Sequence, residues 1–413
     1  MLLSPYRVLD LTDQRGMLAG QILADLGADV IAIEPPDGSS ARSVGPFAGD
    51  DPGPDRSLFW WVYARNKRGI TCNLDHPDGQ DLIRQLAAGA DFVLESADPG
   101  AMPARGLGYD DLSANHDDLI YTSISAFGQS GPKAGYQATD LVLMAAGGPL
   151  ILSGGAGEAP VRVSVPQAWS HASGEAAIAA MVALRARSRI GRGQYIDISA
   201  QQSVAAATMS ANLAASIGAA ETARVAGGMA VGPFTGKLIW EVADGYISLT
   251  FLFGSGIGPF SRRLFEWMYD EGDCSLEDRD LDWIGLGAEF ISGARPLSDW
   301  ARLMEVVGEF LKKRTRGELF AEAQSRSLLI VPVTTVDEVA NSEQFEAREF
   351  WREHEMPGWP DPVRFPGPFV KLSDNEIEYR RRAPALGEHN AEVYAELGLD
   401  DDALSDLRER GVI

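Results

Sequence analysis

Strand and helix patterns alternate at the beginning of the chain, and this alternation constrains the fold more than any other feature. Residues 7–12 are apolar and rich in β-forming types, and the segment after them repeats apolar residues at the spacing of one helix face. Gly27 is placed to end that helix, and residues 30–33 form the next expected strand. The pattern predicts a strand–helix–strand unit whose helix face consists of Leu18, Ile22 and Leu26.

A second unit of the same kind follows, with Pro77 near the start of a helix, Gly89 at its end and a strand at 92–94. Because such units build parallel sheets covered by helices, we expect an α/β fold with a Rossmann-like large domain. Ligands of such sheets bind at the carboxyl ends of the strands. No Gly-x-Gly-x-x-Gly pattern follows the first strand, so a nicotinamide dinucleotide is not indicated.

The pattern changes beyond Ser199. Residues 199–219 predict one long helix of small residues, and the Gly-rich stretch 226–236 predicts a linker. Residues 239–252 hold strand-like pieces around Asp244-Gly245, which is the signal of a hairpin. Helices are expected at 300–313 and 319–324, the second after a capping box formed by Thr315 and Glu318.

These segments predict a smaller α+β domain at 225–330. The large domain then consists of its N-terminal part, 1–224, and a linker and return at 331–413. The Pro-rich run 357–368 is expected to be an extended connection. A chain of 413 residues is also longer than one ordinary hydrophobic core requires, which favours two domains.

The charge and the cysteine content exclude several classes of function. A net charge of −23 disfavours partners with a phosphate backbone and anionic membranes, so neither nucleic acid nor membrane is an expected partner. Cys72 and Cys274 are far apart and have no metal-binding spacing, so no metal site or disulfide is predicted. No leader-like segment and no apolar run of roughly 18 to 20 residues is evident, which predicts a cytoplasmic protein.

Short motifs occur along the chain in a characteristic order. They are Val8-Leu9-Asp10-Leu11-Thr12, Leu23 to Val30 with Glu34-Pro35-Pro36, Asn66-Lys67-Arg68, Phe127 to Pro132, Gly191-Arg192-Gly193-Gln194, and Gly387-Glu388-His389 through to Ile413. Together they resemble the family III CoA-transferases, the formyl-CoA and carnitine CoA-transferase type, over nearly the whole chain.

The resemblance implies an architecture that the residue patterns alone do not. Members of the family are similar to two interlocked rings, in which each chain passes through its partner and long linkers carry the small domain. We therefore expect an interlocked-ring dimer, or a heteromer built on the same plan, whose monomer has no independent stability.

The resemblance also implies a covalent mechanism, and here the chain departs from the family. In the family a carboxylate attacks the acyl-CoA thioester, and its acyl derivatives carry the exchange. That position lies before the helical run 174–190 and its Gly-rich turn, and it maps to Trp169 or Ser170. An indole has no acidic group, and a serine ester is a poor route back to a CoA thioester.

Three nearby groups are weak substitutes. His171 is a possible acid or base but is more typical of a hydrogen-bonded wall residue. Glu175 is expected on the first turn of the helix, where the helix dipole favours a carboxylate. Asp140 matches an acidic family position that fixes a loop. The racemases that share the fold use a His-Asp dyad, which maps to Thr139 and again to Trp169 or Ser170, so both of its members are missing.

CoA recognition is expected from polar and basic residues of the large domain. A positive pocket is what an anionic ligand needs on so acidic a protein. The family segment near the CoA phosphates matches Asn66, Lys67 and Arg68. Other expected contacts are Gln14 or Arg15 after the first strand, then Arg42, and then Ser96 and Arg105, where the family has different residues at or beside the matching positions.

Two functions remain open. The first is a non-catalytic subunit of a family III CoA-transferase, which moves CoA between an acyl-CoA, with succinyl-CoA as a candidate, and a carboxylic acid. An aspartate-bearing paralogous chain then supplies the nucleophile. The second is a self-sufficient CoA-thioester isomerase or lyase that uses His171 or Glu175. In both, the CoA thioester is a substrate, and no permanently bound cofactor is expected.

Overall fold

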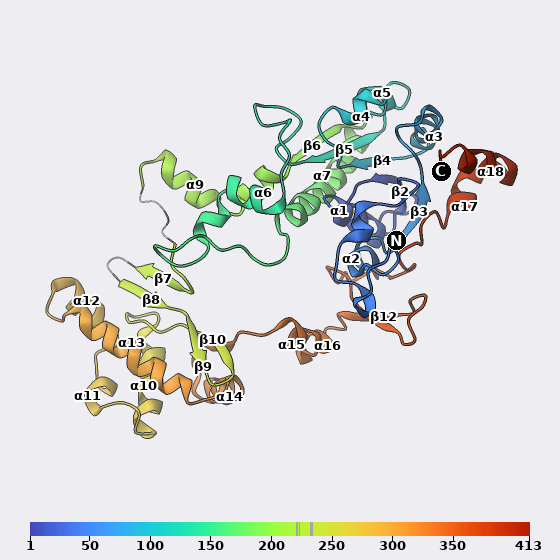
Figure 1. The fold of residues 1–413 in the computed structure, drawn as a ribbon. Helices are drawn as coiled ribbons and strands as arrows, with labels where there is room; N and C mark the ends of the chain where they lie inside the picture. Colours follow the sequence, from blue (N-terminus) through green and yellow to red (C-terminus); the bar gives the residue numbers. More distant parts are fainter. Residues whose placement is uncertain (220–221, 223, 232–233) are drawn as a thin grey trace. The chain divides into compact units, whose positions relative to one another are not determined.

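The computed structural model describes the whole chain except residues 220–221, 223 and 232–233. The chain divides into two compact units (Figure 1). The first contains 1–150, 162–219 and 343–413, and the second contains 151–161 and 220–342. The expected end of the small domain at residue 330 falls inside a strand, β11 (Ile330–Pro332), which pairs with β10 (Gly245–Leu249). This pairing keeps the chain in the second unit beyond that point.

The first unit is built on a parallel sheet of six strands, which confirms the predicted α/β fold. The strand order is β3-β2-β1-β4-β5-β6, and every neighbouring pair is parallel. The order reverses between β1 and β4, so a crevice is expected outside the carboxyl ends of these two strands. The strands are β1 (Arg7–Leu11), β2 (Asp29–Glu34), β3 (Lys67–Thr71), β4 (Phe92–Glu95), β5 (Ile120–Ser125) and β6 (Tyr195–Ser199).

Helices cover both faces of this sheet. Val8 of β1 belongs to a core with α1 (Met17–Asp25) and α7 (Ala168–Ile190). The next residue, Leu9, faces a core with α3 (Pro77–Ala87), α17 (Asn390–Ala395) and α18 (Asp401–Glu409). The remaining helices are η1 (Ser40–Ser43), η2 (Ala48–Asp50), α2 (Leu58–Tyr63), α4 (Ala101–Ala104), α5 (Tyr109–Ser113), α6 (Asp140–Ala146), α8 (Ala200–Ala206), α9 (Met209–Ser216) and α16 (Glu343–Ala347), with η3 (Pro149–Leu152) at the border of the two units.

Two helix predictions need correction. Leu18 and Ile22, which were expected on the apolar face of α1, are among its less buried residues. The helix packs against both the sheet and α7, so it is buried almost all round. The single helix expected at 199–219 is interrupted. It ends at Ala206, and α9 begins at Met209. The Thr208 hydroxyl donates to the carbonyl of Ala205, at 3.1 Å, which is a local alternative to helical bonding.

The second unit combines a small antiparallel sheet with helices, and its core is rich in tryptophan and phenylalanine. The hairpin predicted around Asp244-Gly245 is confirmed as β9 (Ile239–Val242) and β10, and the capping box of Thr315 and Glu318 is also present. The expected linker contains paired strands instead, β7 (Gly228–Val231) and β8 (Phe234–Lys237), although 232–233 lie outside the described residues. The helices are α10 (Gly258–Asp270), α11 (Leu276–Arg279), α12 (Leu286–Ser292), α13 (Leu297–Lys312), α14 (Arg316–Arg326) and α15 (Val336–Ala340).

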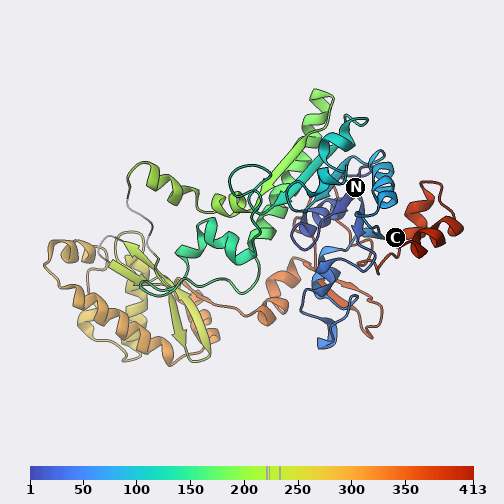
Figure 2. The same ribbon diagram turned by 45° about the horizontal axis from the view of Figure 1, so that its top comes forward.

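The C-terminal return completes the first unit. The run expected to be a simple extended connection contributes to a hairpin, in which β12 (Trp351–His354) pairs with β13 (Val363–Pro366). The last helices then lie beside the N-terminal strands, with α17 next to β3 (Figures 1 and 2). Among the described residues, no helix has the length and apolar character needed to cross a membrane.

Candidate functional site

A cavity of about 320 Å³ lies at the carboxyl ends of β1, β4 and β5, beside the reversal of strand order. Asp13 to Arg15 follow β1, Ala97 and Asp98 follow β4, and Ser125 ends β5. Because ligands of open parallel sheets bind at such an edge, this is the first candidate site. We call it the Trp169 cavity, and the rest of its wall is formed by Pro99, Ala126, Tyr136, Gln137, Ala138 and Trp169.

Trp169 is positioned by the beginning of α7. The Asp140 carboxylate accepts hydrogen bonds from the backbone N–H groups of Gln167 and Ala168, each at 2.7 Å. These bonds fix the N-terminal end of α7, where backbone donors lack partners within the helix. Asp140 therefore fixes the beginning of α7, and the half-buried indole of Trp169 lies between the core and the cavity.

The other residues near Trp169 are placed differently. Ser170 and His171 are exposed and are not among the described residues that line the cavity. Glu175 was expected on the first turn of the helix, but α7 begins at Ala168, so Glu175 lies well inside it. Its carboxylate accepts a hydrogen bond from the Ser203 hydroxyl at 2.6 Å.

Two carboxylates and one guanidinium carry the charge of the Trp169 cavity. Arg15 forms an ion pair with Asp13 at 2.8 Å and with Asp98 at 3.3 Å. Burial opposes the charge of Arg15, but hydrogen bonds and attraction from Asp13 and then Asp98 raise its pKa above the ordinary value. Asp13 also accepts a hydrogen bond from Ser96 at 3.0 Å, so its carboxylate is held firmly.

Ser125 offers a polar group to the same cavity. It is only 3% exposed, and its hydroxyl has no hydrogen-bond partner among the described residues. An unpartnered buried hydroxyl costs about 1–3 kcal/mol, so a ligand that bonds to it gains more than it would at an exposed serine.

A second cavity of about 530 Å³ lies at the ends of β1, β2 and β4 and shares Asp13, Arg15 and Ala97 with the first. We call it the Arg105 cavity. Ser96 and Arg105, both expected ligand contacts, line it, and Arg105 donates to Asp75 at 2.7 and 2.8 Å. Asp75 is an exposed partner, with 77% of its side chain accessible. Arg105 can therefore exchange this partner for a ligand at small cost.

Cys72 also lines the Arg105 cavity. Its thiol is buried, and desolvation raises its pKa to about 12 despite a hydrogen bond with Tyr394. A thiol with so high a pKa holds little thiolate at neutral pH and is a poor nucleophile.

The basic run expected near the ligand is turned into the protein instead. Lys67 is fully buried and donates to Asp10 at 2.7 Å, and Arg65 pairs with buried Asp25 at 2.8 Å. The Asn66 side chain bonds Asp25 at 2.7 Å. Arg68 bonds Asp29 and two glutamates of the C-terminal return, Glu392 and Glu396. Burial opposes the charge of Arg68, but Glu396 and Asp29 raise its pKa above the ordinary value.

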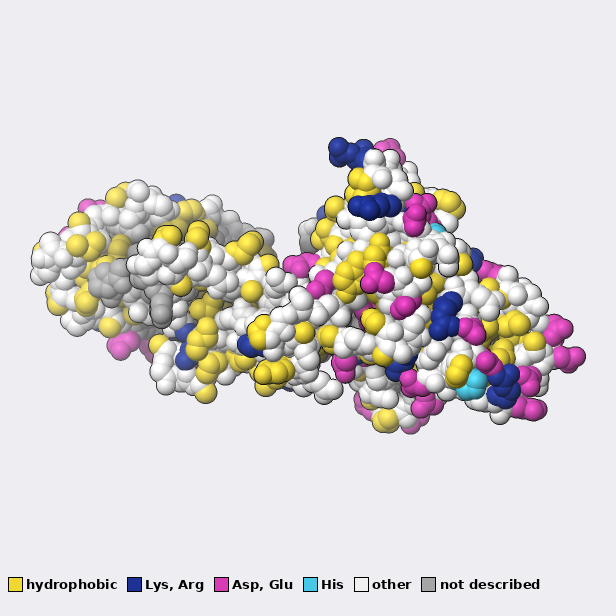
Figure 3. Space-filling model, turned by 90° about the horizontal axis from the view of Figure 1, so that it is seen from above, with side chains coloured by type: hydrophobic (Ala, Val, Ile, Leu, Met, Phe, Trp, Pro, Cys, Tyr) yellow, Lys and Arg dark blue, Asp and Glu magenta, His cyan; other side chains and the backbone are white. Residues whose placement is uncertain are grey.

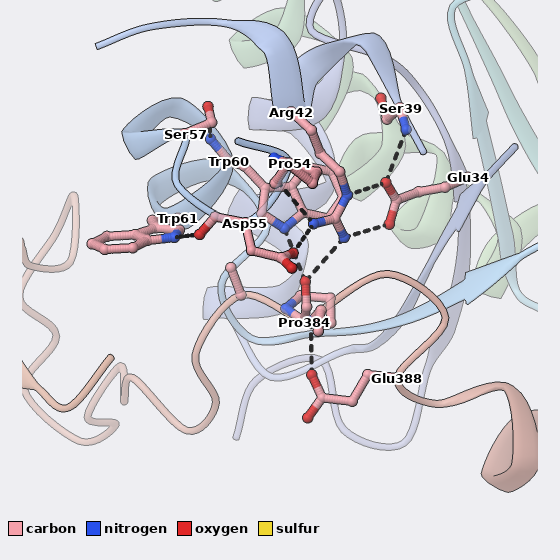
Figure 4. Close-up of polar contacts among 12 residues, drawn as sticks. Glu34, Ser39, Arg42, Pro54, Asp55, Ser57, Trp60, Trp61, Pro384 and Glu388 are labelled. Carbon is pink, nitrogen blue, oxygen red and sulfur yellow. Dashed lines mark hydrogen bonds and ion pairs between the residues drawn. The ribbon is translucent and has the colours of Figure 1, made fainter. Parts of the chain in front are cut away.

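Arg42 is likewise a structural residue here (Figure 4). Its guanidinium lies 4.0 Å from the centre of the Trp60 ring and donates to Glu34 at 2.6 and 2.8 Å. It also donates to Asp55 at 2.7 Å and to the carbonyl of Pro384 at 3.1 Å. Since Arg42 is only 2% exposed, it ties the end of β2 to the C-terminal return and does not face a cavity.

The structure brings some of the predicted site residues to the cavity walls and uses others elsewhere. Gln14, Arg15, Ser96, Arg105 and Trp169 line the two cavities. Asn66, Lys67, Arg68 and Arg42 are used in the interior, and Asp140 acts on α7. Sequence reasoning missed Asp13, Asp98 and Ser125, although each directly ends or follows a parallel strand, the place where side chains reach a ligand.

Comparison with known proteins identifies the family. The model of CoA-transferase family III matches residues 3–390. The chain belongs to CoA-transferase family III. Relatives of this family with CoA-transferase names match it over nearly its whole length, and CoA thioesters are the substrates of the family. The chain is accordingly a CoA-transferase by family.

Three relatives illustrate the match. The subunit BbsE of succinyl-CoA:(R)-benzylsuccinate CoA-transferase from Thauera aromatica is 32% identical over 99% of this chain and 98% of that protein. Succinyl-CoA–D-citramalate CoA-transferase from Chloroflexus aurantiacus is 30% identical over 100% of this chain and 98% of that protein. The crystal structure of a CAIB/BAIF family protein from Brucella suis superposes with a TM-score of 0.80 at 26% identity, covering 96% of this chain and 100% of that chain.

Proposed function

We propose that this chain is the non-catalytic subunit of a heteromeric family III CoA-transferase and that a paralogous chain with an aspartate at the matching position supplies the nucleophile. One observation carries the proposal. The indole of Trp169 lines the cavity, and the resemblance to the family maps its reactive carboxylate to Trp169 or Ser170. An indole N–H only donates hydrogen bonds and forms no acyl derivative.

The remaining carboxylates of the Trp169 cavity are poorly suited to replace it. Asp13 is engaged by Arg15 and Ser96, and Asp98 is paired with Arg15. A carboxylate that is neutralised by a guanidinium is a weaker nucleophile than a free one. Asp98 is nevertheless the more accessible of the two, with 59% of its side chain exposed, so it needs its own control in any activity test.

CoA binding is the second part of the proposal. The two cavities share wall residues Asp13, Arg15 and Ala97 and lie at the edge where the strand order reverses. We assign the anionic end of CoA to the Arg105 cavity and its thioester end to the Trp169 cavity. Arg105 is the cation best able to meet a phosphate, because its present partner Asp75 is exposed.

Exposed apolar side chains support an assembly with a second chain. Helix α9 exposes Met209 and Leu213 one turn apart and buries none of its residues, and Ile217, directly after the helix, is also exposed. Helix α7 exposes Ile178 and Val182 one turn apart. Figure 3 shows apolar side chains interspersed among charged ones on one face of the molecule. Since faces of this kind mark protein contacts, we propose that they are covered in an interlocked dimer or heteromer.

The substrates are inferred by analogy. The names of the two CoA-transferases described above, from Thauera aromatica and Chloroflexus aurantiacus, both include succinyl-CoA, and the first is that of a subunit. We propose succinyl-CoA as the donor and a carboxylic acid as the acceptor for the complex that contains this chain.

The test compares the chain alone with the chain co-expressed beside its paralogue. The purified chain should transfer no CoA between succinyl-CoA and added acids, and its Trp169→Asp variant should stay inactive, because the neighbouring cavity residues also differ from the family. The complex should be active. A covalent acyl or CoA adduct on the chain alone, detected by mass spectrometry, would contradict the proposal, and its loss in Asp98→Asn would identify the residue responsible.

The alternative, a self-sufficient CoA-thioester isomerase or lyase, draws less support from the site. His171 is exposed outside the cavity wall, and Glu175 is bonded to Ser203. Exchange of an acyl-CoA α-proton with solvent deuterium, catalysed by the chain alone and abolished in His171→Asn or Glu175→Gln, would favour this alternative.

A further inference from the structure

A third cavity, of about 300 Å³, is lined by residues of β4, β5 and β6 of the same sheet and by residues of α4, α5 and the adjoining loops. It shares only Asp98 with the Trp169 cavity. We call it the Tyr195 pocket. Its volume is in the range of small-molecule sites, and neither the nucleophile position nor the expected CoA contacts belong to it.

Three tyrosine rings form one wall of the Tyr195 pocket. Tyr109, Tyr121 and Tyr195 have ring centroids 5.7 to 6.3 Å apart, so all three are neighbours. They come from α5, β5 and β6, which are separate elements brought together by the fold. Tyr121 is fixed because it is buried and donates its hydroxyl to the carbonyl of Leu107 at 3.1 Å.

The charged side chains in the wall of the Tyr195 pocket are all acidic, and one of them, Asp98, is paired with Arg15, which lies outside the wall. Glu95, Asp98, Asp110 and Asp111 line it, and no lysine, arginine or histidine belongs to the described residues of its wall. An anionic ligand such as a carboxylate or phosphate is therefore disfavoured. A cation would be attracted both by the carboxylates and by the negative faces of the aromatic rings.

Glu95 lies deepest among these carboxylates and is only 3% exposed. Its oxygens accept hydrogen bonds from the Ser123 hydroxyl and from the backbone N–H of Ala97, the latter at 2.7 Å, and no cation in the part of the chain that the structure describes forms an ion pair with it. Desolvation raises the pKa of Glu95 to about 7, against smaller opposing effects of Ser123, Ala97 and Arg15. A buried carboxyl in this condition has an unsatisfied preference for a positive partner.

The residue types in the wall also indicate which kind of cation fits the pocket. A divalent metal ion is coordinated by several oxygen ligands at once. In the described part of the chain, no group of three or more His, Cys, Asp or Glu side chains is arranged to hold such an ion. Aromatic rings instead favour amines and methylated ammonium groups, whose charge is spread over an apolar surface. We propose that the Tyr195 pocket binds a small organic cation, an amine or a quaternary ammonium compound.

This inference is independent of the proposed function. Its wall shares Asp98 with the Trp169 cavity and Met102 with the Arg105 cavity, and the inference holds whether the chain is catalytic or not.

Binding of choline to the full chain, in complex with its paralogue if the two co-purify, tests the inference by calorimetry. The matched control ligand is 3,3-dimethylbutan-1-ol, which has the shape of choline without the charge. Choline should bind saturably, and the neutral compound at least about tenfold more weakly. Equal binding of the two compounds, or no saturable choline binding, would overturn the inference.

Variants locate the binding to this pocket. Tyr195→Leu, at a position that is 41% exposed, should fold normally and weaken choline binding about five- to tenfold. Glu95→Gln should weaken it by a similar factor. Tyr246→Leu is the matched control, because Tyr246 is an exposed tyrosine of the second unit, and it should leave binding unchanged. Equal losses in all three variants would show that the binding lies elsewhere.

The pH dependence gives a second readout. Choline binding should strengthen as the pH rises through about 7, where Glu95 loses its proton, and this dependence should vanish in Glu95→Gln. The groups that face Glu95 are Arg15 from the turn after β1, Asp98 from its own loop, Tyr109 and Asp111 from α5, Tyr121 and Ser123 from β5, and Tyr195 and Asp197 from β6. The same pH dependence in wild type and variant would contradict a role of Glu95.

Discussion

Two sets of basic side chains were expected to bind the same ligand, but the structure has one set in the interior and the other in cavity walls. Lys67 and Arg68 are buried, as is the neighbouring Arg65, and their partners are carboxylates of other strands and helices. Arg15 and Arg105 line cavities, and each has a partner that is partly or largely exposed. The first set holds elements of the fold together, whereas the second set remains available to a ligand.

The difference teaches that a basic motif is not by itself a binding site. A buried ion pair is held strongly because neither group can return to water when its partner leaves. An exposed pair is worth little, so a ligand can replace one of its members. Which cation reaches an anionic ligand is therefore decided by the burial of its present partner.

The largest expected effect tests the buried set. Lys67→Met should destabilise the chain by about 3–5 kcal/mol, because it leaves the Asp10 carboxylate buried without its cation. Urea unfolding measures the change. The double variant Lys67→Met with Asp10→Asn should recover a large part of the loss. A loss below about 1 kcal/mol in the single variant would show that the pair is not effectively buried.

Glu95→Gln extends the comparison to a buried carboxyl that, unlike Asp10, has no direct cationic partner among the described residues. Its folded-state pKa is raised to about 7, above the value of 4.5 for an unperturbed glutamate. The folded chain therefore holds the proton longer than the unfolded chain, and stability is lost as the pH rises from about 4.5 to about 7. At about 1.4 kcal/mol per pKa unit, the variant should be more stable by roughly 2–3 kcal/mol at pH 8.

Thermal unfolding at pH 5 and pH 8 checks this prediction. The gain of Glu95→Gln should be clear at pH 8 and small at pH 5. Asp118→Asn, at an exposed position, is the control and should show neither effect. A gain of the same size at both pH values would mean that the ionisation of Glu95 is not its cause.

Arg105→Ala tests the second set, the arginines that line cavities. It should weaken CoA binding about tenfold, the expected effect of losing one charge-assisted contact to a phosphate, and leave the urea midpoint almost unchanged. Arg410→Ala removes a comparably exposed arginine elsewhere and should leave CoA binding unaltered. If both variants weaken CoA equally, Arg105 acts only through the net charge of the protein.

Asp75→Asn has the smallest expected effect and the opposite sign. It frees Arg105 from its exposed partner, so CoA binding should become about two- to fivefold tighter in calorimetry. Asp81→Asn removes the exposed partner of a different arginine, Arg84, and is the matched control. Weaker binding in Asp75→Asn would indicate that Asp75 orients Arg105 for the ligand and does not compete with it.

Local patterns predicted the parallel sheet well. The strand and helix periods at 7–12, 77–89 and 92–94 depend only on neighbouring residues, and the structure places elements there. The pairing of Gly228–Val231 with Phe234–Lys237 was missed because glycine-rich strands carry little side-chain pattern. The family resemblance, and not a local pattern, pointed to Trp169 or Ser170, and the structure has Trp169 in a cavity wall, on a helix that ends at Gly191 in a left-handed conformation.

The ion pairs could not be predicted in the same way. Lys67 and Asp10 are separated by most of two strand–helix units, and their contact also requires Gly20, where a Cβ atom would lie 2.0 Å from the Asp10 carboxylate. Nothing in the local sequence distinguishes Lys67, which is buried, from Arg105, which lines a cavity. The difference arises only when distant elements meet.

The C-terminal end of the edge strand β3 contacts the last part of the chain. The side chain of Asn390 bonds the backbone and hydroxyl of Thr71, and the carbonyl of Val412 accepts from Asn73. A ribosome that adds about 5–20 residues per second needs roughly 20 to 70 seconds to reach this point after it has made β3. During that interval the nascent sheet has an open border, which gives chaperones, or a second nascent polypeptide, time to engage before the fold is complete.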